Sequence, residues 1–169
     1  AENGGDRSRE ALEVLRPRSG GSCFTDGGGF AWRVYPYVEG TICCQRAETP
    51  ELFAASGRAF GRFQRLLQGY PAGTLHETIP RFHDTEDRLA KLKAAIAADA
   101  LGRAKDCGKE IDFALAREKD CSEALNALRA GVLPLRVTHN DTKLNNVLLD
   151  EKTGEGLCII DLDTVMPGL

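Results

Sequence analysis

HNDTKLNN, residues 139–146, is followed shortly afterwards by IIDLD, residues 159–163, and these two stretches decide the fold. Each stretch stands at the end of an apolar run, residues 132–138 for the first and residues 157–160 for the second. Short apolar runs of this kind are typical of buried strands. The pattern therefore predicts two short strands whose polar ends bring acidic side chains together.

The residue types at these strand ends suit phosphoryl transfer. That reaction needs a carboxylate to orient the attacking hydroxyl and accept its proton, and oxygen ligands that hold Mg²⁺ on the phosphates. Asp141 is the predicted base, while Asn146 and Asp161 supply the hard oxygen ligands that Mg²⁺ prefers. Lys143 is expected to neutralise the charge that develops on the transferring phosphate.

A second acidic residue, Asp163, leaves two interpretations open. It lies on the same side of an extended chain as Asp161, so it either supports the metal or caps a turn. The pair Asp161-x-Asp163 after an apolar strand also resembles the D-x-D metal motif of nucleotide-sugar glycosyltransferases. Those enzymes would show alternating strands and helices of the Rossmann type near their start, and this chain does not.

The amino-terminal part contains a predicted β-hairpin. Residues 21–39 read GSCFTDGGGFAWRVYPYVE, with two runs of aromatic and branched residues around the turn at 26–29. Glycine supplies the positive φ angle that such a turn requires. Pro36 and Gly40 interrupt strand pairing after the second run, so a connector is expected there. Trp32 is expected in a core.

Helices are predicted in the middle of the chain. The first starts at Thr49-Pro50-Glu51, where Thr caps the helix and Pro takes the first position, and it runs to about Gln68. Its aromatic residues are expected to face a core. The second starts after a cap at Asp84 or Thr85, and a less regular helical stretch covers residues 104–128.

Two histidines stand in the segment LHETIPRFHDT, residues 75–85, before the second helix. His76, His83 and Asp84 do not have the spacing of a standard zinc site. Surface and capping roles are therefore predicted, and contact with an acceptor substrate is the alternative.

HNDTKLNN and IIDLD together resemble the H-x-D-x-x-x-x-N catalytic loop and the metal-binding strand end of protein kinases and of the aminoglycoside phosphotransferase and choline kinase-type family. The resemblance implies a protein-kinase-like α+β fold, present in part. A small-lobe β-hairpin would be followed by a mainly helical large lobe with short catalytic strands. Residues 1–39 would be the remnant of the small lobe with its hinge, and residues 40–169 an incomplete large lobe.

The same resemblance implies further site residues. WRVYPYVEG, residues 32–40, looks like the last small-lobe strand and the hinge, so Tyr37, Val38 and Glu39 are expected to contact the adenine of ATP. His139 would support the catalytic loop by hydrogen bonding rather than act as the base. ATP as phosphate donor and Mg²⁺ are the implied cofactors.

Three segments are similar to the kinase group that includes N-acetylhexosamine 1-kinase. They are LHETIPRFHDT at 75–85, VTHNDTKLNNVLLD at 137–150 and CIIDLDTVMPGL at 158–169. This similarity implies a small-molecule acceptor, an amino sugar phosphorylated on its anomeric hydroxyl. Aminoglycosides, choline and homoserine are the alternative acceptors, and a truncated kinase-like binding module without catalysis is a further interpretation.

Composition argues against other classes of function. No apolar run approaches the roughly 20 residues of a membrane span, so membrane association is not expected. A net charge of -3 with scattered Lys and Arg argues against nucleic acid as a partner. The six cysteines show no C-x-x-C spacing and are expected to be free thiols. The start of the chain lacks the features of a signal peptide, so a cytoplasmic location is expected.

Several kinase parts are not found in this sequence. No Gly-rich phosphate loop, no lysine on a small-lobe strand and no paired helix glutamate precede the hairpin. The first residue is Ala, and the last, Leu169, follows closely after the second apolar run. We therefore expect the chain to be a piece of a longer kinase that is inactive without the rest.

Overall fold

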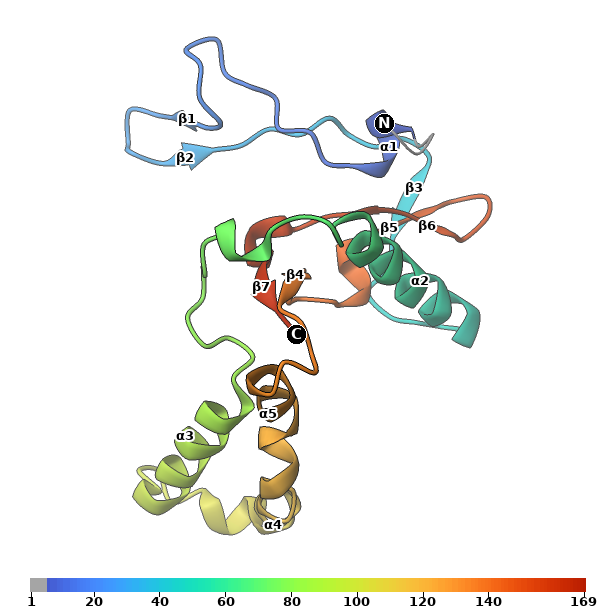
Figure 1. Cartoon of the computed structure of the whole chain (residues 1–169). Helices are drawn as coiled ribbons and strands as arrows, with labels where there is room; N and C mark the ends of the chain where they lie inside the picture. Colours follow the sequence, from blue (N-terminus) through green and yellow to red (C-terminus); the bar gives the residue numbers. More distant parts are fainter. Residues whose placement is uncertain (1–5) are drawn as a thin grey trace. The chain divides into compact units, whose positions relative to one another are not determined.

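The computed structural model describes residues 6–169, which form two compact units (Figure 1). The first unit joins residues 6–67 to Asp141–Asp163, and the second joins Gln68–Asn140 to Thr164–Leu169. The predicted catalytic loop therefore passes from one unit to the other between Asn140 and Asp141. The predicted small-lobe remnant begins with residues 1–5, which lie outside the described part, and its boundary at residue 39 stays a prediction.

An antiparallel sheet forms the centre of the first unit. Its strand order is β3 (Thr41–Cys43), β5 (Val147–Asp150) and β6 (Gly156–Ile159). Side chains alternate along β5, so Val147 and Leu149 have no exposed surface. Figure 1 shows helix α2 beside this sheet. The mixture of helices with antiparallel strands agrees with the predicted α+β class.

Helix α2 (Pro50–Leu66) confirms the predicted helix and its start. The Thr49 side chain caps it by accepting a hydrogen bond of 3.2 Å from the Leu52 N–H. Phe60 on this helix is buried, but Phe53 is 69% exposed. The prediction that all the aromatic residues of this helix face the core is therefore wrong for Phe53, because the buried face is centred on smaller residues.

Close contact between α2 and β6 explains why the buried face of α2 is centred on small residues. A Cβ atom at Gly156 of β6 would lie 2.4 Å from the Cβ of Ala59 and 3.2 Å from the carbonyl oxygen of Ala55. Only small residues permit this approach, so the helix turns its alanines toward the strand. The buried core of the unit consists of Ala55, Ala59, Phe60, Val147, Leu149 and Ile159, with Cys44, Leu52 and Phe63 packed against it.

The predicted hairpin is confirmed as β1 (Phe24–Thr25) paired antiparallel with β2 (Ala31–Trp32). Asp26 in its turn accepts hydrogen bonds from the indole Nε1 of Trp32 at 2.8 Å and from the Phe30 N–H at 3.0 Å. These bonds, that of Trp32 foremost, lower the pKa of Asp26. Trp32 is 57% exposed, so its prediction as a core residue is wrong. Its indole ring instead stabilises the turn through the hydrogen bond to Asp26.

A two-stranded sheet of β4 (Arg136–Thr138) and β7 (Met166–Gly168) belongs to the second unit. The strand predicted for residues 132–138 is wrong over its first four residues. The N–H groups of Val132 and Leu133 donate instead to the carbonyl oxygen of Ala127, near the end of the preceding helix. Local hydrogen bonding therefore delays the strand until residue 136.

Three helices make up most of the rest of this unit: α3 (Thr85–Ala98), α4 (Gly108–Leu115) and α5 (Glu123–Arg129). Asp84 caps α3, as one of the two predicted candidates, by accepting a hydrogen bond of 2.9 Å from the Asp87 N–H. None of the three helices contributes a buried residue. Salt bridges join Glu86 to Arg129 and Lys93 to Glu118.

The remaining described elements are short. They are α1 (Arg7–Glu10) and the 3₁₀ helices Ala72–Thr74, Ala104–Cys107, Glu118–Ser122, Leu144–Asn146 and Leu162–Thr164. Within residues 6–169, no helix combines the length and apolar character needed to cross a membrane.

Candidate active site

Hydrogen bonds within the loop hold the carboxylate of Asp141. The Asn146 side chain donates from Nδ2 to the Asp141 carbonyl oxygen at 2.9 Å and to its Oδ2 at 3.0 Å. The backbone turns tightly here, since the Lys143 N–H donates to the Asp141 carbonyl at 2.9 Å. Asn146 is only 3% exposed. The predicted base is thus oriented by a buried amide at the start of strand β5.

Lys143 brings a positive charge between two carboxylates. Its Nζ lies 2.8 Å from Oδ2 of Asp141 and 3.9 Å from Oδ2 of Asp161. The hydrogen bond to Asp141 raises the pKa of Lys143, and the charges of Asp141 and Asp161 add to the shift. The ammonium group is therefore charged at neutral pH and marks a place where two predicted site carboxylates meet.

Asp161 occupies an unusual backbone conformation at the end of β6. Its φ angle is 60°, in the left-handed region that residues other than glycine seldom adopt. Such strain costs about 1–3 kcal/mol and is concentrated at functional sites. The neighbouring Ile160 N–H donates to the Asn146 carbonyl at 3.0 Å, which ties the end of β6 to the loop. Asp161 is thereby turned toward Lys143.

Asp163 has a different partner. Its Oδ1 lies 2.5 Å from the guanidinium Nη2 of Arg33. The hydrogen bond that Arg33 donates to Asp163, more than any other contact, raises the pKa of Arg33. The structure therefore gives Asp163 an ion pair that the sequence analysis did not foresee, and its role as a metal ligand stays a prediction.

A cleft of about 240 Å³ in the first unit contains two of the three residues expected at the adenine. Tyr37 and Val38 line it, whereas Glu39 does not. The Glu39 carbonyl instead accepts a hydrogen bond of 3.2 Å from Arg9 Nη2. Four further residues line the cleft that the sequence analysis did not single out: Leu12, Thr41, Cys43 and Leu148. Pro36 completes its wall.

Residues 7–169 match the model of the phosphotransferase enzyme family (APH). The chain belongs to this family. Because the family has a protein-kinase-like fold, the coarse resemblance drawn from HNDTKLNN and IIDLD is confirmed. The narrower similarity to N-acetylhexosamine kinases stays a prediction.

The donor set of this phosphotransferase chain fits a divalent cation of the magnesium type. Nδ2 of Asn146 is directed at Asp141, so the amide oxygen is the atom of that side chain able to ligate a cation. Asp161 contributes a half-exposed carboxylate. No cluster of three or more His, Cys, Asp or Glu side chains suited to a metal occurs within residues 6–169. A cation shared with phosphates and water needs no such cluster.

His139, predicted to support the loop of this phosphotransferase, belongs to the second unit and is 1% exposed. Its carbonyl oxygen accepts a hydrogen bond of 2.6 Å from Thr164 Oγ1. Burial of this kind agrees with a supporting role, because a base must reach its substrate. All the other predicted site residues lie in the first unit: Tyr37, Val38, Glu39, Asp141, Lys143, Asn146, Asp161 and Asp163.

Proposed function

We propose that the protein is an ATP-dependent kinase that transfers the γ-phosphate of ATP to a hydroxyl of a small molecule. One observation carries this proposal: the Asp141 carboxylate, held by Asn146, shares the ammonium of Lys143 with Asp161. A base, a fixed positive charge and a second carboxylate are thus assembled in one place. Phosphoryl transfer requires little more of a protein than such positioning and charge.

Asp141 would act on the acceptor. Its carboxylate would accept a hydrogen bond from the attacking hydroxyl and take the proton as the new oxygen–phosphorus bond forms. The bond between the γ-phosphorus and its bridging oxygen would break, and ADP would leave. General base catalysis of this kind contributes a factor of about 10²–10⁴ to a rate. The Lys143 ammonium, 2.8 Å from Oδ2 of Asp141, offsets the negative charge of this carboxylate.

Lys143 and the ligand residues would act on the phosphates. The Lys143 ammonium lies close enough to both carboxylates to offset the charge developing on the transferring group. Asn146 and Asp161 would hold Mg²⁺, which when bound offsets the charge of the ATP phosphates. Asp163 would bind the metal only after its ion pair with Arg33 is broken, so we assign it a smaller role in metal binding than Asn146 and Asp161.

The acceptor we favour is an N-acetylhexosamine, phosphorylated on its anomeric hydroxyl. Support comes from the similarity of residues 75–85, 137–150 and 158–169 to the group that includes N-acetylhexosamine 1-kinase. Aminoglycosides, choline and homoserine are the competing acceptors. All of them offer a hydroxyl to the same base.

The nucleotide-sugar glycosyltransferase interpretation is weakened by the acidic pair itself. A D-x-D motif would direct both carboxylates at one metal. Here Asp161 faces Lys143, whereas Asp163 pairs with Arg33. A non-catalytic binding module is the other alternative, and it would bind ATP without turning it over.

Nucleotide product analysis tests the proposal. The complete natural protein is incubated with Mg-ATP and, in separate reactions, N-acetylglucosamine, N-acetylgalactosamine, an aminoglycoside, choline and homoserine. We expect ADP formation with the two sugars and an acid-labile sugar 1-phosphate as the product. ADP formation with another acceptor would overturn the choice of sugar. The kinase proposal itself would be contradicted by UDP release from a UDP-sugar, or by ATP binding without turnover on any acceptor.

A further inference from the structure

The ring of His83 lies against the backbone just before the predicted base. Its Nε2 is 2.6 Å from the carbonyl oxygen of Asn140, and both residues belong to the second unit. A carbonyl oxygen only accepts hydrogen bonds, so Nε2 must carry the proton and donate. That carbonyl belongs to the peptide bond that joins Asn140 to Asp141. His83 therefore holds the backbone at the peptide bond that directly precedes Asp141.

Asn140 itself is held in a constrained conformation. Its φ angle is 65°, in the left-handed region. Its side chain donates from Nδ2 to the carbonyl oxygens of Thr138 and Thr164, both at 3.0 Å, and its Oδ1 accepts from Thr138 Oγ1 at 2.8 Å. The side chain is thus fixed from one direction, and His83 fixes the backbone carbonyl. Together these contacts set the direction of the peptide plane.

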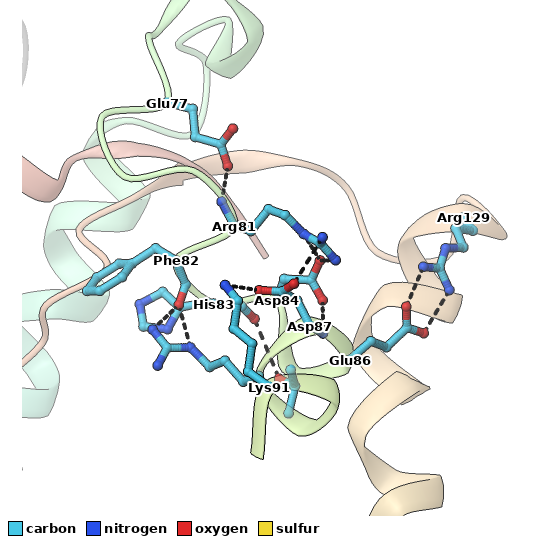
Figure 2. Close-up of polar contacts among 11 residues, drawn as sticks. Glu77, Arg81, Phe82, His83, Asp84, Glu86, Asp87, Lys91 and Arg129 are labelled. Carbon is cyan, nitrogen blue, oxygen red and sulfur yellow. Dashed lines mark hydrogen bonds and ion pairs between the residues drawn. The ribbon is translucent and has the colours of Figure 1, made fainter. Parts of the chain in front are cut away.

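The turn that carries His83 is held by charged groups (Figure 2). Arg81 has a φ angle of 56°, and its N–H donates to Oε1 of Glu77 at 2.8 Å. Its guanidinium donates from Nε to Asp84 Oδ2 at 2.9 Å and pairs with Asp87 at 3.0 Å. Asp84 also caps helix α3, so the turn is anchored to that helix.

Three further contacts restrain the ring of His83 and the helix α3 that follows it. The rings of Phe82 and His83 have centroids 4.5 Å apart, and Arg88 donates from Nε to the Phe82 carbonyl at 2.7 Å. Glu86 on α3 accepts two hydrogen bonds from Arg129 on α5, at 3.0 Å and 2.7 Å, as Figure 2 shows. His83 is exposed to solvent, yet the segment that presents it is anchored on both sides.

We propose that His83 is a positioning residue for the catalytic loop: its Nε2–H holds the Asn140 carbonyl and so sets the direction in which Asp141 is presented. This inference rests on the proposed role of Asp141 as the base. It assigns a function to the segment at residues 75–85, which the proposed chemistry otherwise leaves unused. A misplacement of about 1 Å at a reacting group can lower a rate by about 10²-fold.

A competing role for His83 is direct contact with the acceptor. His83 and Asn140 both line a cleft of about 400 Å³ within the second unit, together with Arg81, Leu128 and Met166. A residue that binds the acceptor would alter the KM for the acceptor when removed. A residue that positions the base would instead alter kcat, because substrate binding does not depend on it.

Steady-state kinetics of the complete natural protein separate these roles. We expect His83→Ala to lower kcat by about 10- to 100-fold with little change in either KM. His83→Gln, whose amide can place an N–H donor where Nε2 lies, should recover most of the loss. His76→Ala, in the same segment, is the matched control and should retain wild-type kcat. Wild-type kcat in His83→Ala, a raised acceptor KM alone, or no recovery in His83→Gln would overturn the proposal.

Imidazole ¹⁵N NMR of the unmodified protein tests the contact without relying on activity or on a variant. We expect His83 to show a protonated Nε2. The Nδ1–H tautomer would overturn the inference even in an active kinase. If the protein phosphorylates no acceptor, the proposed function fails, and this spectrum still decides whether His83 holds the loop.

Discussion

The sheet of the first unit and the helices of the second are stabilised by different forces. In the sheet, Val147 and Leu149 have no exposed surface, and α2 approaches β6 closely enough that Gly156 has no room for a side chain. In contrast, α3, α4 and α5 contribute no buried residue, and charged contacts such as that of Glu86 with Arg129 join them.

This difference matters for the candidate site. Asn146 and Asp161 stand at the ends of buried strands, so apolar packing fixes the positions of the predicted ligands. His83 stands in a turn held by Arg81 and Asp84, so charge fixes the position of the proposed positioning residue. Changes in the sheet should therefore affect stability most, whereas loss of charge at low pH should weaken the contacts between the helices.

The largest expected effect on stability is that of Leu149→Ala. Removing a fully buried leucine costs about 2–5 kcal/mol, because the surrounding core relaxes only in part. Leu101→Ala in the second unit is the control: Leu101 is 73% exposed, and surface changes usually stay within about 0.5 kcal/mol. Chemical denaturation measures both. Equal losses from the two variants would contradict the contrast between the units.

A pair of glycine substitutions sharpens the account of α2 and β6. Gly156→Ala should destabilise by about 1–3 kcal/mol, because an added Cβ must push against a packed helix. Gly57 lies within α2 and has open space around it. Gly57→Ala should therefore stabilise by about 0.4–1 kcal/mol through helix propensity and a less flexible unfolded chain. Effects of the same sign would show that α2 does not approach β6 this closely.

The smallest expected effect is a loss of folding stability at low pH. The hydrogen bond from the Asp87 backbone N–H, followed by the side-chain hydrogen bond from Arg81, lowers the pKa of Asp84 below 3.8. The side-chain hydrogen bond from Arg129 lowers the pKa of Glu86 below 4.5. Since the folded pKa values are depressed, the stabilisation is complete above the ordinary values and is lost as pH falls through the lowered ones.

Thermal melting at a series of pH values measures that loss. Glu86→Gln keeps the shape of the side chain but cannot ionise, so it should lose less stability than the wild type on acidification. The ion pair of Glu86 with Arg129 is largely exposed. The difference in acid-induced loss of stability between Glu86→Gln and the wild type should therefore be modest and should shrink in high salt. Identical acid profiles for the two proteins would show that the contact with Arg129 does not stabilise the helices.

Local signals in the sequence were sufficient for the starts of α2 and α3. Thr49 and Asp84 were predicted as candidate caps, and each accepts the expected backbone hydrogen bond. Strands β3, β5 and β7 were not predicted, and because β4 and β6 are equally short, length does not explain the difference. Thr41 of β3 pairs with Asp150 of β5, and no local sequence pattern predicts a strand partner so distant in the chain. The exposure of Phe53 and Trp32 was missed because composition does not show which face packs.

The candidate site was predictable to the extent that a motif carries it. The loop spacing identified Asp141 and Asn146, and the structure places them in hydrogen-bond contact. The ion pair of Arg33 with Asp163 and the contact of His83 with Asn140 join residues that only the tertiary fold brings together. Neither contact has a signature in sequence spacing.

The rate of ADP formation by Asp141→Asn in the complete protein tests the central claim most directly. Asp120→Asn, an exposed change outside the site, is the matched control. The account predicts a rate about 10²–10⁴-fold below wild type for Asp141→Asn, since the amide cannot accept the proton of the acceptor hydroxyl, and an unchanged rate for Asp120→Asn. A wild-type rate in Asp141→Asn would contradict the assignment of Asp141 as the base.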